Sequence, residues 1–124
     1  MTENKKNNQK GIGKAPQKQK NKFYSQKSNN PREVALLVLH KVENEGAFSN
    51  LALNGELQKR NLTPLDKGLA TELVYGTLRN QGEIDYILSL FLTKPLSKLP
   101  LWILLILRLG LYQMRHMDKI PDSA

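Results

Sequence analysis

The sequence predicts an all-α protein, a bundle of about five helices joined by short connections. Apolar residues between positions 31 and 124 recur at steps of three and four, which is the spacing of helices with one buried face. Leucine outnumbers the β-branched residues in this region, and no segment alternates between apolar and polar residues. These observations favour helices and argue against strands.

The charge of the chain is concentrated at its beginning. The whole chain carries 19 Lys and Arg residues against 11 Asp and Glu, a net charge of +8. Residues 1–30 contain eight of the lysines and one acidic residue, Glu3, whereas residues 31–124 are nearly neutral. A segment so rich in Lys, Asn and Gln cannot bury enough apolar surface to offset the entropy of ordering it. We therefore predict a disordered basic tail over residues 1–29 and one folded domain over residues 30–124.

Two helices are predicted in the first part of this domain. Asn30 can cap the first, Pro31 suits its first position, and Glu33 lies three residues after the cap. The helix should end before Gly46, which suits a left-handed cap. A second helix is predicted over about residues 50–60, where two basic residues at the end suit the negative end of the helix dipole.

Three further helices complete the predicted bundle. Thr63 and Pro64 give the third helix a capping hydroxyl and a first-turn proline. A break at Gln81–Gly82 separates it from a fourth, whose apolar residues follow the i, i+3, i+4, i+7 pattern. The fifth, from about Pro100 to Met117, would be about 27 Å long. Because its first turns are apolar almost all round, we expect it to be the central helix of the bundle.

Composition excludes several classes of protein and site. The chain has no cysteine, hence no disulfide, thiolate metal site or cysteine nucleophile, which suits the cytoplasm. Its beginning lacks the apolar stretch of a signal peptide, and the apolar run Leu99–Leu107 is shorter than a membrane span of about 20 residues. His40 and His116 have no partners at metal-site spacing, so we interpret both as packing or surface residues. No catalytic constellation is visible, and we expect no enzymatic activity, metal or cofactor in this chain.

Two positions inside the predicted helices are unusual. Arg108 lies in the most apolar helix, where an unpaired guanidinium group would be costly. We predict a structural ion pair between Arg108 and Glu72; the alternative is an exposed Arg108 that contacts phosphate. Gly76 costs its helix about 1 kcal/mol relative to alanine. We therefore expect Gly76 to permit the close approach of another helix.

Electrostatics favour nucleic-acid binding. A flexible lysine-rich tail neutralises phosphates with little sequence selectivity. Basic residues of the folded part lie near helix ends, where they could converge beside the tail, although ordinary solvated surface charges would give the same pattern. The predicted RNA contacts are Arg32, Lys67 and Arg79, followed by Lys59 and Arg60. Four aromatic residues fall mainly on apolar faces and are predicted to lie in the core rather than to stack on bases: Tyr75, Tyr86, Trp102 and Tyr112.

Several stretches of the chain resemble a known family. Residues 66–79, which end in Glu-Leu-Val-Tyr-Gly-Thr-Leu-Arg, resemble a signature of the NusB-like domain at the front of bacterial 16S rRNA cytosine methyltransferases, the RsmB or Sun/Fmu family. The free-standing antitermination factor NusB shares the fold but is less similar in this signature. Four other stretches agree with the family in order and spacing: residues 30–35, 46–54, 107–113 and 118–121.

The resemblance implies an RNA-binding domain that presents rRNA to a following Rossmann-like domain. In that family the second domain uses S-adenosylmethionine and a cysteine nucleophile to methylate carbon 5 of a cytidine. A further helix after Pro121 would complete the bundle. Because the chain ends before both, the resemblance implies a truncated rRNA-binding fragment without the cofactor. The alternative is a stand-alone NusB-type module for transcription antitermination, which would also bind a ribosomal protein.

Overall fold

The computed structural model describes residues 28–117. The predicted disordered tail, apart from its last two residues, and the turn expected at residues 118–121 lie outside the described residues. Between them the chain forms five α-helices, a short 3-10 turn and a final π-helical turn. The described residues contain no strand, so the prediction of an all-α fold is confirmed.

The first helix, α2 (Pro31–Glu45), begins and ends as predicted. The side-chain oxygen of Asn30 accepts hydrogen bonds from the backbone N–H groups of Arg32 at 2.8 Å and Glu33 at 3.3 Å. These bonds satisfy two of the donors that a helix leaves unpaired at its start. At the other end Gly46 has a φ of 72°, a left-handed conformation that glycine adopts without strain.

The next two helices are α3 (Ser49–Gln58) and α4 (Pro64–Arg79). The start of α4 is capped as predicted, because the hydroxyl of Thr63 accepts a hydrogen bond from the backbone N–H of Asp66 at 3.1 Å. The start of α3 has no side-chain cap. The chain therefore fixes the beginning of α4 by local chemistry, whereas α3 depends more on its packing against α2 and α4.

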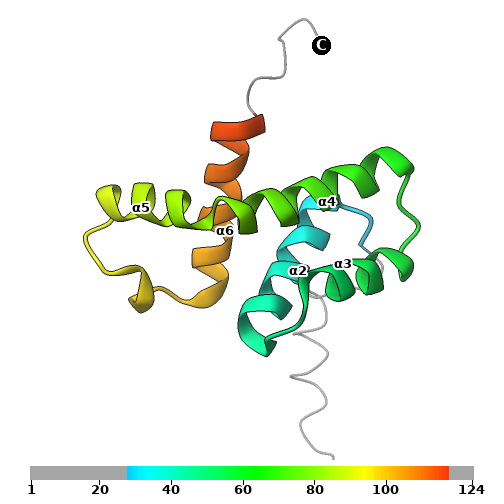
Figure 1. Ribbon diagram of the computed structural model, residues 1–124, viewed down its shortest axis with the longest axis horizontal. Coiled ribbons are helices and arrows are strands. Elements are labelled where there is room, and N and C mark those ends of the chain that lie inside the picture. Colours follow the sequence, from blue (N-terminus) through cyan, green and yellow to red (C-terminus); the bar gives the residue numbers. More distant parts are fainter. Residues whose placement is uncertain (1–27, 118–124) are drawn as a thin grey trace, which may run out of the picture.

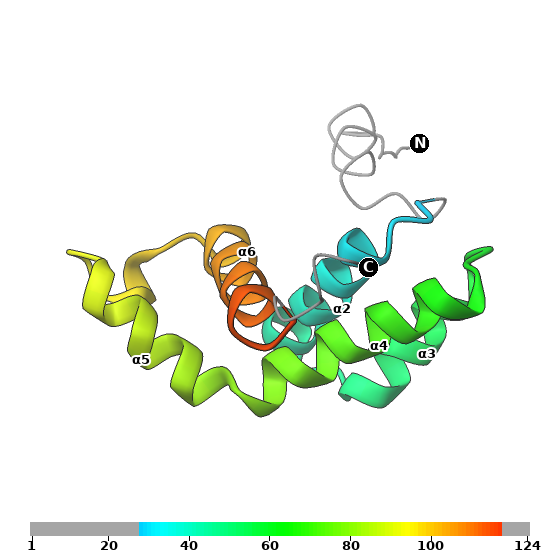
Figure 2. The same ribbon diagram turned by 90° about the horizontal axis from the view of Figure 1, so that it is seen from above.

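The second part of the chain contains α5 (Gln81–Phe91), the 3-10 turn η2 (Leu96–Lys98), α6 (Leu101–Tyr112) and the π-helical turn η3 (Gln113–Met117). Only Asn80 separates α4 from α5, so the break lies one residue before the predicted position. Figure 2 shows α4 and α5 as the two arms of a shallow V, with α2 and α6 on its inner side.

Residues of all five α-helices, whose arrangement is shown in Figure 1, contribute to the buried core, and α2 and α4 contribute the most. α6 packs on α2, α4 and α5 but is not enclosed as a central helix, because Ile103 and Ile106 are 45% and 47% exposed. An apolar sequence favours burial, but the number of faces that are covered depends on how many neighbouring helices reach it. The fully or almost fully buried apolar residues of α2 and α4 are Val34, Ala35, Val38, Ala70, Leu73 and Val74.

The crossing of α4 and α6 depends on Gly76. A Cβ at this position would lie closer than 3.0 Å to the ring and hydroxyl of Tyr112, a distance that real side chains do not tolerate. Tyr112 is 2% exposed, so its ring has little room to move aside. The expectation that Gly76 permits close helix approach is therefore confirmed.

The helices within residues 28–117 were compared with the requirements of a membrane span. None of them combines the length and the apolar character that a membrane span requires.

Candidate nucleic-acid interface

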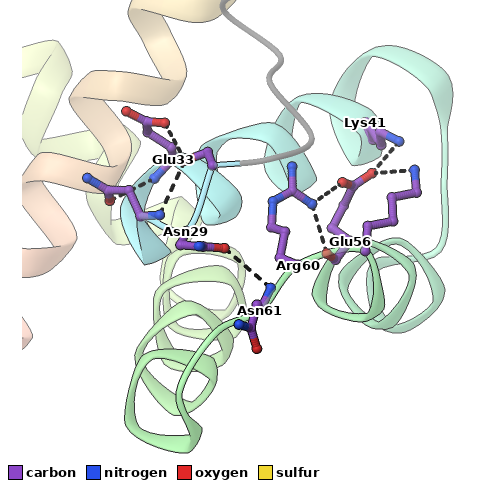
Figure 3. Close-up of polar contacts among 9 residues, drawn as sticks. Asn29, Glu33, Lys41, Glu56, Arg60 and Asn61 are labelled. Carbon is purple, nitrogen blue, oxygen red and sulfur yellow. Dashed lines mark hydrogen bonds and ion pairs between the residues drawn. The ribbon is translucent and has the colours of Figure 1, made fainter.

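The strongest concentration of charge in the described residues surrounds Glu56, near the end of α3 (Figure 3). Arg60 Nη1 lies 2.6 Å from Glu56 Oε1, and Lys41 Nζ lies 2.5 Å from Oε2. Lys59 Nζ lies 3.5 Å from the same Oε2. One carboxylate thus faces three cations, one from α2 and two from the loop that follows α3, which leaves a local excess of positive charge.

Burial and pairing act in opposite directions on Glu56, whose side chain is 3% exposed. Burial alone would raise the pKa of Glu56, but the hydrogen bonds from Lys41 and Arg60 and the charges of Lys41 and Lys59 outweigh it. The pKa therefore lies below its usual value, and the carboxylate stays ionised at neutral pH. The two lysines are 31% and 43% exposed, so they can also reach an anion in solution.

Arg60 does not have the position predicted for an RNA contact. Its side chain is 1% exposed, and Nη1 also donates to the backbone carbonyl oxygen of Glu56 at 2.8 Å. The structure places Arg60 inside the protein because a buried carboxylate four residues earlier in the chain attracts it. Lys41, which was not among the predicted RNA contacts, is the partly exposed cation that pairs with Glu56 from α2. Its link to Glu56 spans 15 positions and left no local signal in the sequence.

Arg32 lies at the other side of α2, next to the end of α6. Its Nε donates a hydrogen bond to the Oε1 atom of Gln113 at 2.6 Å, and the residue is exposed. The chain before α2 also touches the loop between α3 and α4, because the side-chain oxygen of Asn29 accepts from the backbone N–H of Asn61 at 3.3 Å (Figure 3). Asn29 therefore lies beside the loop that carries Lys59 and Arg60.

Lys67 and Arg79 are both exposed on α4, but they do not converge. Lys67 belongs to the first turn and Arg79 is the last residue of the helix, about 18 Å apart along the axis at 1.5 Å per residue. Arg79 Nη2 also lies 3.7 Å from Glu72 Oε2. The five predicted contacts thus form no single patch.

Arg108 forms an ion pair, but the predicted partner is wrong. Its Nε and Nη2 atoms each donate to one carboxylate oxygen of Asp85 at 2.8 Å, and Glu43 lies 3.7 Å away. This bidentate pair joins α5 to α6 and excludes the alternative of an exposed Arg108, since the side chain is 8% exposed. Glu72 instead accepts a hydrogen bond from the hydroxyl of Tyr112.

The surroundings of the Tyr112 hydroxyl raise its pKa. Burial and then the neighbouring Glu72 carboxylate raise the pKa of Tyr112 to about 12. The tyrosine therefore stays neutral and keeps its hydrogen-bond proton at physiological pH.

The remaining aromatic and histidine residues differ in how far they are buried and in what they contact. Trp102 is half-buried and lies outside the core cluster, and the centroid of its ring lies 3.8 Å from that of His40, with the two rings nearly parallel. Burial of His40 lowers its pKa. Tyr86 is 66% exposed, so its predicted place in the core is wrong. His116 stacks on Tyr112 and lies 3.6 Å from Glu83. No group of three or more acidic, His or Cys residues within residues 28–117 is arranged to hold a metal ion.

Comparison with known proteins identifies relatives of two kinds. The chain is 45% identical over 98 residues to the probable ribosomal RNA small subunit methyltransferase B of Bacillus subtilis, covering 79% of this chain and 22% of the relative. It is 37% identical over 93 residues to the protein of the same name from Synechocystis, covering 75% and 21%. The transcription antitermination protein NusB of Acetivibrio thermocellus is 32% identical over 94 residues, covering 75% and 65%.

The chain spans about a fifth of the length of these methyltransferase relatives. No solved structure matches it. The family model described as the NusB family matches residues 29–124, which include all five α-helices and the buried core. This chain therefore belongs to the NusB family.

Proposed function

We propose that this chain is the RNA-binding domain of an S-adenosylmethionine-dependent methyltransferase that modifies cytidine in small-subunit rRNA. In this role it positions rRNA for a catalytic domain that the rest of a longer polypeptide supplies. The observation that carries the proposal is the 45% identity, over 79% of the chain, to a probable ribosomal RNA small subunit methyltransferase B.

The arrangement of charge supports RNA as the ligand. Lys41 and Lys59 share one carboxylate oxygen and keep part of their surface in solvent, so phosphate groups can offset their remaining charge. Eight further lysines precede α2 in the sequence, and a polyanion could also offset their charge. Arg32, Lys67 and Arg79 are exposed at separate places and would contribute separate contacts rather than one binding pocket.

The test is the binding of the purified chain to transcribed segments of small-subunit rRNA over a range of salt. A protein that neutralises several phosphates loses affinity by orders of magnitude between about 50 and 200 mM salt. Replacing Lys41 and Lys59 by Gln should weaken binding and reduce its salt dependence. The matched control replaces Lys94 and Lys98 by Gln, since these exposed lysines lie in the connection between α5 and α6. No binding at about 50 mM salt would contradict the proposed function.

The proposal assigns no chemistry to this chain alone. Methylation of a pyrimidine carbon through a covalent intermediate requires a thiolate, and the chain has no cysteine. We expect the isolated chain to bind no S-adenosylmethionine and to transfer no methyl group to rRNA. Equilibrium dialysis with the labelled cofactor checks the first expectation, and label incorporation into rRNA checks the second. Retained cofactor or labelled rRNA would contradict this assignment.

A second candidate function is that of a transcription antitermination module that binds a ribosomal protein as well as RNA. The similarity to the Acetivibrio NusB protein, which covers 65% of that relative, favours it. Mixing the nuclease-treated chain with purified small-subunit ribosomal proteins, one at a time, separates the two candidates. A stoichiometric complex supports the antitermination module, whereas binding to RNA alone supports the methyltransferase domain. Both candidates act in the cytoplasm, where we expect the protein to be located.

A further inference from the structure

Two lysines from different parts of the chain converge on one oxygen atom (Figure 3). The Nζ atom of Lys41 in α2 lies 2.5 Å from Glu56 Oε2, and that of Lys59, which follows α3, lies 3.5 Å from the same oxygen. The two ammonium groups are therefore at most about 6 Å apart. Like charges at this distance repel each other, so the pair is stable only with negative charge close to both.

Glu56 does not supply enough negative charge for both lysines. Its other oxygen, Oε1, lies 2.6 Å from Arg60 Nη1, and the Arg60 and Glu56 side chains are 1% and 3% exposed. This ion pair is the buried base of the cluster, in which one carboxylate faces three cations. Among the residues that the structure describes, Lys41 and Lys59 have no other carboxylate partner. The cluster therefore has an excess of two positive charges.

This excess charge lies on the two side chains that reach the surface. Lys41 and Lys59 are partly exposed, whereas Glu56 and Arg60 are buried. An ammonium group has three N–H donors, and each of these lysines directs one of them at Glu56. Two donors of each lysine are left for another acceptor. An anion that meets both lysines from the solvent side would therefore receive hydrogen bonds and offset the remaining charge.

We propose that Lys41 and Lys59 together hold one backbone phosphate of RNA, an inference that rests on the proposed RNA-binding function. A phosphodiester has two free oxygens, so one phosphate can accept a charged hydrogen bond of about 2.7–2.9 Å from each lysine. Lys41, which makes the shorter contact with Glu56, stays bound to it. Lys59, which makes the longer contact and is the more exposed, turns toward the phosphate.

The salt dependence of RNA binding counts the phosphates that a protein neutralises. For a single strand, the logarithm of the binding constant falls with the logarithm of the salt concentration, with a slope of about −0.7 for each phosphate. Binding of the full chain to oligouridylate is measured between about 50 and 200 mM salt. The variants are Lys41→Gln, Lys59→Gln and the combination of both. The matched control combines Lys94→Gln and Lys98→Gln, which removes the same charge from two other exposed lysines.

The expected result is the loss of one phosphate contact for two lysines. Each single variant should weaken binding but keep nearly the wild-type slope, because the remaining lysine still neutralises the phosphate. The double variant should lose about 0.7 from the slope rather than about 1.4. Its loss of affinity should exceed the product of the two single losses, because either lysine alone keeps the phosphate bound. The control should keep the wild-type slope.

Circular dichroism and thermal unfolding check that each variant is folded. If the double variant is not, Lys59→Gln alone decides between the alternatives, because its side chain is partly exposed and Glu56 keeps two other partners. Two separate phosphates would cost this single variant about 0.7 of the slope, whereas one shared phosphate would leave the slope nearly unchanged and the affinity lower.

Three outcomes would overturn the proposal. A loss of about 1.4 in the double variant, half of it in each single variant, means that the lysines contact two separate phosphates. Equal losses in the double variant and the control mean that the lysines act only through the net charge. Unchanged affinity and slope in the double variant remove the phosphate from this cluster while RNA binding itself stands. A wild type that binds no oligouridylate at about 50 mM salt contradicts the proposed function as well, which is a distinguishable result.

Discussion

The two halves of the described fold bury their charges in different ways. In the first half, formed by α2, α3 and α4, the carboxylate of Glu56 gathers three cations. In the second half, formed by α5, α6 and η3, the guanidinium of Arg108 gathers two carboxylates. The first half leaves three large apolar residues exposed, Phe48, Leu51 and Leu65, whereas the second leaves six: Tyr86, Leu90, Phe91, Ile103, Ile106 and Met114.

This difference indicates that the first half has the more stable core, although its six basic and six acidic residues balance each other. The second half is held to it mainly by the crossing of α4 and α6 and by the packing of α6 on α2. Local unfolding should begin where fewer apolar residues are enclosed, which is the second half. Four substitutions test this comparison.

The largest loss is expected for Glu56→Gln in the first half. It leaves the guanidinium of Arg60, 1% exposed, without its carboxylate partner. Removing one partner of a buried ion pair lowers the free energy of unfolding by about 3–5 kcal/mol, measured by urea denaturation. Glu45→Gln, at an exposed position of α2, is the control and should change little. A loss no larger than that of the control would show that the cluster does not stabilise this half.

The wild type and Glu56→Gln should also differ in how their free energy of unfolding depends on pH. The pKa of Glu56 is lower in the folded protein than its ordinary value of 4.5. The stabilisation it provides is therefore present above about pH 4.5 and is lost as the pH falls through the folded pKa. In Glu56→Gln the free energy of unfolding, measured by urea denaturation at several pH values, should fall less on acidification than in the wild type.

A smaller loss is expected for Asp85→Asn in the second half. Arg108 loses its bidentate partner, but Asp85 is 28% exposed and Glu43 remains near, so the cost should be about 2 kcal/mol. Amide hydrogen exchange should accelerate in α5 and α6 while α2 to α4 keep their protection. Glu83→Gln, which breaks an exposed pair with Arg115, is the control and should leave exchange unchanged. Equal acceleration in both halves would mean that they unfold as one unit.

The contact between the halves is tested by Gly76→Ala. The added methyl group overlaps the ring of Tyr112, and such overpacking costs about 1–3 kcal/mol. In the same helix Gly68 has nothing within 4 Å of its Cβ position. Gly68→Ala should therefore raise the free energy of unfolding by up to about 1 kcal/mol. Similar effects of both substitutions would contradict the close crossing.

The smallest effect is expected for Tyr112→Phe, which removes only the hydroxyl that donates to Glu72. The cost should be about 1 kcal/mol, and Tyr86→Phe on the exposed face should cost nothing. Because the pKa of Tyr112 is raised from 10.0 to about 12, the wild type loses this stabilisation as the pH rises above 10. Absorbance titration should detect one tyrosine that ionises near pH 12 and is missing in Tyr112→Phe.

Features that depend on neighbouring residues were predictable from the sequence. Asn30 and Thr63 cap the helices that follow them, and Gly46 ends α2, because caps involve contacts within a few residues. The family signature also gave the fold class. The limits of α3 were less certain because its start has no side-chain cap.

Partners across the fold were not predictable in the same way. Arg108 and Asp85 are 23 positions apart, and nothing in the sequence distinguishes Asp85 from Glu72 as the partner. The prediction that Arg60 contacts RNA was wrong for a different reason. Its four-residue spacing from Glu56 was readable as a helical ion pair, but the residue was grouped with other cations as an RNA contact. Tyr86 shows that an apolar pattern predicts a helix more reliably than it predicts the burial of each residue.

The crossing at Gly76 and Tyr112 also restricts the order in which this sequence can change. Alanine at position 76 is costly while Tyr112 is present and less so after a smaller residue has replaced it, so the effects of the two substitutions are expected to be coupled rather than additive. Once both have changed, restoring tyrosine alone recreates the overlap. Lineages that descend from such a double change must therefore restore glycine before tyrosine, so the crossing fixes the order of substitutions in both directions.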